Sequence, residues 1–164
     1  MSLFLLSVIS SVCMLAADLS HSDASFLKDA AEGGLDEVRL GELATQNATS
    51  QEVKDFARRM MDDHSRMNND LRVLATQKNV SMPDDIGLKD KASLKLLSAK
   101  HGVDFDKAYI SQMVKDHRAD MEAFSKEMNT AADGDVKALA AKALPVIREH
   151  LEMAQKIASS IGAQ

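Results

Sequence analysis

Four long stretches of the chain carry apolar or small residues at alternating spacings of three and four, and this pattern constrains the fold more than any other. Such spacing places an apolar stripe along one side of an α-helix, as in the core of a helical bundle. The stretches cover residues 23–48, 50–78, 104–129 and 135–160, and a shorter helix is expected over residues 88–100. Most connections between them are short, which favours antiparallel neighbours. The sequence therefore predicts an all-α fold: an antiparallel up-down-up-down four-helix bundle with an extra short helix between its second and third long helices.

The overall composition agrees with a helical fold and excludes several functions. The 164-residue chain contains only 7 Gly and 2 Pro, and helix-forming residues abound. No long segment alternates with a period of two, so we expect no sheet. The net charge of −5, without a basic stripe and without Trp, argues against nucleic-acid binding. No Gly-rich phosphate loop or nucleophile turn is recognisable, so the sequence does not favour an enzyme.

The first 17 residues contain no charged side chain and form an apolar run that ends at Asp18. This run is short for a membrane span, which needs about 20 apolar residues. We therefore predict a bacterial signal peptide over residues 1–17 and one mature domain over residues 18–164, located in the periplasm or secreted. An uncleaved membrane anchor is the alternative. Because Cys13 is the only Cys and lies inside the run, the mature chain would contain no Cys and no disulfide. Cleavage of the apolar run would also leave no membrane span.

One polar residue interrupts each of the four apolar stripes. In chain order these residues are Glu37, His64, His117 and His150. With a rise of about 1.5 Å per residue, each lies at a similar height from the turn that joins its helix to an antiparallel neighbour. Helix axes about 8–10 Å apart allow such side chains to meet. The sequence therefore predicts that these four side chains converge near the middle of the bundle.

An acidic residue precedes each of the three histidines: Asp63, Asp116 and Glu149. Residues adjacent in sequence lie about 100° apart around a helix, so each carboxylate flanks the stripe and can face the next helix. A carboxylate placed there can orient an imidazole ring, which is its usual role around metal ligands. Tyr109 lies two turns before His117 on the same side of its helix and is a further candidate for this supporting role.

Two kinds of helix-breaking residue lie inside the expected helices. Gly33, Gly34 and Gly41 fall in the first long helix, where Gly costs about 1 kcal/mol relative to Ala. We interpret them as a close approach of helices beside Glu37 or as space for a ligand, with a kink as the alternative. Pro145 predicts a kink or one missing backbone hydrogen bond in the last helix.

Several short motifs carry a resemblance to a known family. They are Ala30-Ala31-Glu32-Gly33-Gly34-Leu35-Asp36-Glu37-Val38, Met60-Met61-Asp62-Asp63-His64, Phe105-Asp106-Lys107-Ala108-Tyr109, Met113-Val114-Lys115-Asp116-His117 and Leu144-Pro145. Over residues 25–155 the chain resembles the bacterial family named domain of unknown function 4142, of the ferritin-like superfamily. This resemblance implies an exported ferritin-like bundle without an established activity. Ferritin-like di-iron proteins carry Glu three residues before their His. Here those positions hold Met61, Val114 and Ile147, so di-iron oxygen chemistry is not implied.

Two interpretations of the four polar core residues stay open. In the first, Glu37, His64, His117 and His150 bind one transition-metal ion, with Zn²⁺ as the first expectation, Fe, Mn or Cu as alternatives, and no haem. In the second, they form a buried hydrogen-bond network in an envelope stress or interaction module, whose partner is an envelope protein or a second copy of the chain. Met residues one turn from His64 and His117 favour Cu(I), although Met in a bundle core is mostly apolar filling.

Overall fold

The structure is a computed structural model that describes residues 19–163; these residues form five α-helices and no strand. The helices are α1 (His21–Asn47), α2 (Gln51–Gln77), α3 (Leu88–Ser98), α4 (Gly102–Thr130) and α5 (Gly134–Ile161). The predicted all-helical fold is therefore confirmed. Within the described part of the chain, no helix has both the length and the apolar character needed to cross a membrane. The predicted signal peptide lies outside the described residues.

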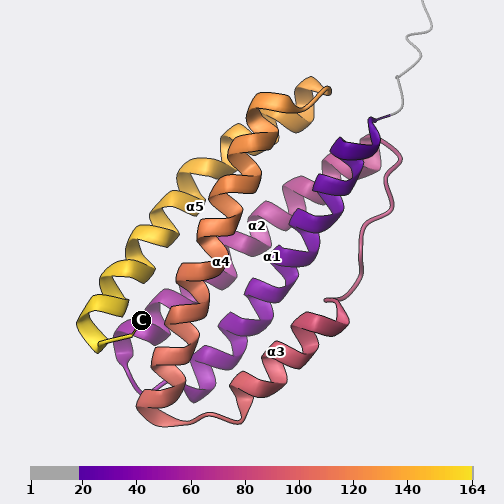
Figure 1. Ribbon diagram of the computed structural model, residues 1–164. Coiled ribbons are helices and arrows are strands. Elements are labelled where there is room, and N and C mark those ends of the chain that lie inside the picture. Colours follow the sequence, from indigo (N-terminus) through magenta and orange to yellow (C-terminus); the bar gives the residue numbers. More distant parts are fainter. Residues whose placement is uncertain (1–18, 164) are drawn as a thin grey trace, which may run out of the picture.

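The four long helices pack as two pairs. α1 contacts α2, α4 contacts α5, and the pairs meet through contacts of α2 with α5 and of α1 with α4. Figure 1 shows these helices side by side, with the short α3 lying along the outside of α1. α3 contacts both α1 and α4. Each long helix thus turns one face toward an interior that it shares with its neighbours.

The helix ends differ from the sequence expectation by a few residues. α1 begins after Ser20, whose hydroxyl oxygen accepts a hydrogen bond from the backbone N–H of Asp23 at 3.0 Å. α4 begins at Gly102, two residues before the start expected from the sequence, so Asp104 lies in its first turn. Gly102 has a positive φ of 60°, a conformation that Gly adopts without strain. It therefore starts α4 after a sharp change of direction. α5 stays helical through Pro145.

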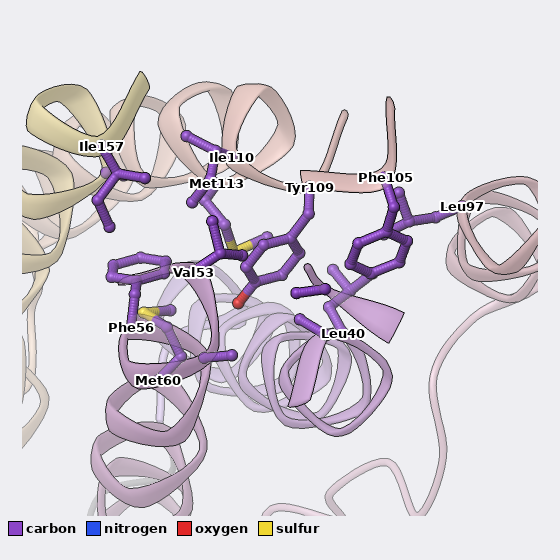
Figure 2. Close-up of a cluster of buried hydrophobic side chains, with 14 residues drawn as sticks. Leu40, Val53, Phe56, Met60, Leu97, Phe105, Tyr109, Ile110, Met113 and Ile157 are labelled. Carbon is purple, nitrogen blue, oxygen red and sulfur yellow. The ribbon is translucent and has the colours of Figure 1, made fainter. Parts of the chain in front are cut away.

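The apolar core is divided along the length of the molecule. One cluster draws on all five helices and includes Leu40, Val53, Phe56, Met60, Leu97, Phe105, Tyr109, Ile110, Met113 and Ile157 (Figure 2). Two smaller clusters, which share Phe26 and Ala30, contain Leu27, Ala31, Leu71, Leu74, Val136, Phe124, Ala140, Ala143, Leu144 and Ile147. Along α2, α4 and α5, the first cluster is separated from the other two by a histidine. The core therefore consists of apolar ends with a polar layer between them.

Candidate metal centre

His64 of α2, His117 of α4 and His150 of α5 form the polar layer. Their ring centroids are 5.6 Å apart for His64 and His117, 5.3 Å for His64 and His150, and 5.4 Å for His117 and His150. One potential ligand atom from each ring lies within 4.8 Å of the other two. The exposed fractions of the three residues are 3%, 0% and 0%. Three of the four side chains expected to converge are thus brought together, and water is excluded from them.

The ring of His117 is held by the backbone of its own helix. Its Nδ1 lies 2.9 Å from the carbonyl oxygen of Met113. A carbonyl oxygen only accepts hydrogen bonds, so Nδ1 carries the proton. Burial, and next the nearby His150, lower the pKa of His117 to about 4, so the ring is neutral at pH 7. Its Nε2 is therefore left with a free lone pair, and this atom has no hydrogen-bond partner among residues 19–163.

The ring of His150 is held through the opposite nitrogen. Its Nε2 lies 3.0 Å from Oδ2 of Asp63. Asp63 also accepts hydrogen bonds from Arg59 at 3.1 Å and Arg66 at 3.2 Å. Partial burial raises the pKa of Asp63, but the hydrogen bonds from His150 and Arg59 outweigh it and lower the pKa below its ordinary value. Asp63 is thus an anion that fixes the proton on Nε2 of His150.

His150 and His64 each also keep a ring nitrogen without a hydrogen bond. Burial lowers the pKa of His150 in spite of the opposing effect of Asp63, so the ring is neutral at pH 7 and Nδ1 keeps its lone pair. Burial, then His117 and His150, hold the pKa of His64 well below its ordinary value. Neither Nδ1 of His150 nor Nε2 of His64 has a hydrogen-bond partner in the described part of the chain. Three neutral imidazoles from three helices thus each keep one unpaired buried nitrogen.

Glu37 of α1 lies beside this layer and outside the three-histidine group. Its Oε1 is 3.7 Å from Nδ1 of His117, which is too long for a hydrogen bond. Glu37, His117 and Asp120 form a second group whose potential ligand atoms lie within 4.8 Å of one another. Burial, then the charges of Asp120, Asp116 and Asp36, raise the pKa of Glu37 well above its ordinary value. Because the pKa of His117 is lowered to about 4, its ring is uncharged at pH 7 and the contact is not an ion pair.

Glu37 also lines a groove of about 1160 Å³ that is bordered by α1, α3, α4 and the end of α5. The pKa of Asp36 is raised to about 7 by burial and by Asp90, Asp116 and Glu32. The pKa of Asp120 is raised to about 7 by burial and by Asp116. Asp116, expected to orient a histidine, lines this groove instead.

The remaining predicted supporting residues lie elsewhere. The carboxylate of Glu149 is half-exposed and pairs with Arg59 at 2.9 Å, so it reaches His150 only through Arg59 and Asp63. Tyr109 is fully buried and packs against Phe56 and Phe105, with ring centroids 6.2 Å away in both cases. Figure 2 shows the ring among apolar side chains, and its hydroxyl has no hydrogen-bond partner within residues 19–163.

Sequence reasoning missed several residues that shape this region. Arg59 and Arg66 lie four residues before and three after Asp63 and hold its charge, and this helical spacing could have revealed them. Asp120 lies three residues after His117, which places it on the same side of α4. Asn68 is buried against Gly34 of α1, and only the packing of α1 on α2 reveals that contact.

The sequence profile of the family described as domain of unknown function (DUF4142) matches residues 13–157. The chain belongs to the DUF4142 family. No curated protein matches this DUF4142 chain in sequence.

Solved structures similar to this DUF4142 protein come from a related helical family and from CopM. A DUF305 fragment from Deinococcus radiodurans has a TM-score of 0.75 at 10% identity, covering 88% of this chain and 98% of that chain. A DUF305 protein from Streptomyces coelicolor has a TM-score of 0.75 at 15% identity, with coverages of 87% and 94%. CopM in the Cu(I)-bound form has a TM-score of 0.71 at 18% identity, with coverages of 84% and 96%. At these identities the likeness establishes a shared fold.

Proposed function

We propose that this DUF4142 protein is an exported helical protein that binds one transition-metal ion through His64, His117 and His150. The observation that carries the proposal is the set of three unpaired ring nitrogens in one buried layer. A buried polar atom without a partner costs about 1–3 kcal/mol, and such atoms are rare in folded proteins. A metal ion accepts all three lone pairs at once and removes this cost.

The donor set favours particular metals. Three neutral imidazoles suit Zn²⁺, which takes water as a fourth ligand in such sites, and they also suit copper. Asp63 fixes the tautomer of His150, as carboxylates do around metal-bound histidines. CopM has a similar fold in its Cu(I)-bound and Cu(II)-bound forms, which makes copper the second metal to test. Fe and Mn rank below both, because the group contains no carboxylate.

The finer description of the fold and location belongs to the same proposal. We infer an antiparallel, ferritin-like four-helix bundle to which α3 is added, and the pairwise packing of the long helices supports it. Export is supported by the uncharged apolar run over residues 1–17.

Metal content and affinity test the function directly. Protein purified without chelator is analysed for bound metal and then titrated with Zn²⁺ and Cu⁺. We expect one ion per chain in the wild type, and loss of binding in His64→Ala, His117→Ala and His150→Ala. His21→Ala and His101→Ala remove exposed histidines and serve as matched controls that keep full binding. A wild type without metal affinity, or controls that lose as much as the layer variants, would overturn the proposal.

The hydrogen bond between Nε2 of His150 and Asp63 gives a finer test of the same metal site. Asp63→Asn keeps the shape of the side chain but weakens its hold on His150, and we expect metal affinity to fall about 10–100-fold. Asp62→Asn changes an exposed neighbouring acid and should leave the affinity unchanged.

A second candidate function is an envelope interaction module in which the polar layer only fixes the register of the helices. The linked contacts of Glu149, Arg59, Asp63 and His150, which need no metal, favour it. In that case Zn²⁺ would not change the melting temperature of the wild type or of His64→Leu. A metal site predicts stabilisation of the wild type alone, by about 2.7 kcal/mol at a ligand concentration 100 times the Kd.

A further inference from the structure

The three-histidine layer is closed to solvent, so an ion needs a route to reach it. His117 and His150 are 0% exposed and His64 is 3% exposed. Of the four polar core residues, Glu37 is the one that lines the groove bordered by α1, α3, α4 and the end of α5. It also lies 3.7 Å from His117. Glu37 thus connects the groove with the histidine layer.

We propose that Glu37 and Asp120 form a transient carboxylate site at the inner end of this groove, through which a divalent transition-metal ion passes to His117 and the histidine layer. The proposal rests on the metal binding proposed above. It assigns Glu37 a role in access to the site, in place of the permanent ligand role that the sequence suggested.

Glu37 has the properties of a cation ligand at this place. It is only 4% exposed, yet its Oε2 has no hydrogen-bond partner among the described residues. Leaving a buried carboxyl oxygen unpaired is costly. A cation that arrives through the groove satisfies this atom, while Oε1 stays on the side of His117.

Asp120 supplies the second carboxylate. It is partly buried in the wall of the groove, and one of its oxygens lies within 4.8 Å of potential ligand atoms of Glu37 and His117. Carboxylate oxygens bind divalent cations well. Glu37 and Asp120 thus form a pair of oxygen donors contributed by α1 and α4.

The lining of the groove supplies further oxygen donors. Six acidic residues line it: Asp36, Glu37, Asp90, Asp116, Asp120 and Glu122. The basic residues that line it are three: Lys89, Lys115 and Arg118. Carboxylate oxygens bind divalent cations, so these acids offer donor atoms along the groove. A Cβ added to Gly33 would meet no atom of the described chain within 4 Å, so this glycine leaves open space beside Glu37.

The geometry favours passage over permanent binding at this pair. Nδ1 of His117 donates its proton to the carbonyl of Met113, so this nitrogen cannot bind an ion in the groove at the same time. An ion therefore meets two carboxylates at the inner end of the groove and three imidazoles in the buried layer. Borderline ions such as Zn²⁺ bind imidazole nitrogen well, so the ion moves inward.

Kinetics of Zn²⁺ exchange distinguish a route from a ligand. Uptake is followed by stopped-flow competition with a fluorescent chelator, and release by adding an excess of a strong chelator. Glu37→Gln and Asp120→Asn keep the side-chain shape and remove the anionic form. A residue that acts only in the route lowers the barrier in both directions, so its loss changes the rates of uptake and release by the same factor. We therefore expect both rates to fall about tenfold or more, with nearly the same equilibrium affinity. Glu42→Gln removes an exposed acid of α1 that does not line the groove and should leave both rates close to those of the wild type.

Contrary results separate this proposal from the function it rests on. Wild-type uptake and release rates in both Glu37→Gln and Asp120→Asn would refute the access route and leave the metal site standing. A loss of equilibrium affinity in Glu37→Gln at an unchanged uptake rate would make Glu37 a permanent ligand and also refute the route. A wild type that takes up no Zn²⁺ or Cu⁺ would remove the metal site itself.

Discussion

His117 and His150 are anchored through opposite ring nitrogens, and this difference decides what each ring can do. His117 donates from Nδ1 to a backbone carbonyl, whereas His150 donates from Nε2 to Asp63. The free lone pairs are consequently on Nε2 of one ring and Nδ1 of the other. At the scale of single residues, the hydrogen-bond partners therefore determine the donor set of the layer.

The acids of the groove respond to pH in a predictable direction. The pKa of Asp120 is raised from 3.8 to about 7 by burial and by Asp116. Between these values the folded protein holds a proton that the unfolded chain has lost, so this carboxyl adds stability below pH 3.8 and the contribution disappears as the pH rises through 7. We predict that Asp120→Asn matches the wild type near pH 4 and exceeds it in unfolding free energy at pH 8.

The size and control of this effect follow from the same reasoning. One pKa unit corresponds to about 1.4 kcal/mol, and Asp120 is partly exposed. Solvent screening therefore reduces the difference to a few kcal/mol at most. Urea unfolding of metal-free protein at the two pH values measures it. His64 and His117 titrate in both proteins and cancel in the comparison. A difference between the variant and the wild type that stays constant with pH would contradict the prediction.

At the scale of helices, glycines set the distance between α1 and α2. A Cβ built at Gly41 would lie 2.6 Å from Cγ of Met61 and 3.1 Å from the backbone oxygen of Ala57. The side chain of Met61 can move, but the backbone of α2 cannot move without separating the helices. The close approach expected from the sequence is therefore present at Gly41, and also at Gly34, where an added Cβ would lie 2.3 Å from Oδ1 of Asn68.

Paired glycine substitutions test this reading of the helix contact. Gly41→Ala forces α1 and α2 apart, and we predict a loss of about 1–3 kcal/mol in unfolding free energy. Gly33→Ala meets no atom of residues 19–163 within 4 Å and should add up to about 1 kcal/mol through helix propensity. Chemical denaturation of metal-free protein measures both. Equal effects of the two substitutions would show that packing does not explain Gly41.

Helical periodicity predicted the buried stripe of α5 completely but that of α4 only in part. On the last helix the spacing of three and four predicts a stripe of seven residues, and all seven are buried: Val136, Ala140, Ala143, Ile147, His150, Ala154 and Ile157. On α4 the same spacing predicts Val114 in the stripe between Ile110 and His117. Val114 instead lines the groove and is only partly buried, while Met113 and Tyr109 are buried. Periodicity defines the direction of a stripe, but the neighbouring helices decide its width and exact phase. Because a groove opens beside α4, its core face is rotated away from the expected one.

The packing of neighbouring helices also limits how much of the candidate site the sequence can predict. The meeting of His64, His117 and His150 could be predicted, because their distances from the turns are similar. The side on which Glu37 lies could not, because it depends on the rotation of α1 about its own axis. The anchor of His117 is a backbone carbonyl, and a sequence does not show which carbonyl a ring will reach.

At the scale of the whole molecule, two buried aspartates tie each helix pair to the other. Asp106 of α4 accepts hydrogen bonds from the backbone N–H groups of Thr49 at 2.9 Å and Ser50 at 2.8 Å, in the connection between α1 and α2. Asp23 of α1 accepts one from the N–H of Asp133 at 2.8 Å, in the connection between α4 and α5. Each connection is thus fastened by a carboxylate from the opposite pair, and the polar layer lies between these two ends.

This arrangement predicts that global stability and the histidine layer can be changed separately. Asp106→Ala leaves two backbone N–H groups without their acceptor and removes a negative charge from the N-terminus of α2, which such a charge stabilises. We predict a loss of about 2–4 kcal/mol in unfolding free energy. Asp104→Ala changes an exposed acid in the first turn of the same helix and should stay within about 0.5 kcal/mol of the wild type.

Metal affinity then shows whether the ends of the molecule also position the site. Asp106 lies about three turns before His117 on α4, roughly 16 Å along the axis. Rigid helices hold the histidine layer in place over that distance, so the folded fraction of Asp106→Ala should bind Zn²⁺ with wild-type affinity. Denaturation followed by helical signal and Zn²⁺ titration below the unfolding midpoint provide the two readouts. A folded Asp106→Ala protein with weakened Zn²⁺ binding would show instead that α4 is aligned from its end, because a small rotation of this helix would turn the free nitrogen of His117 away from His64 and His150.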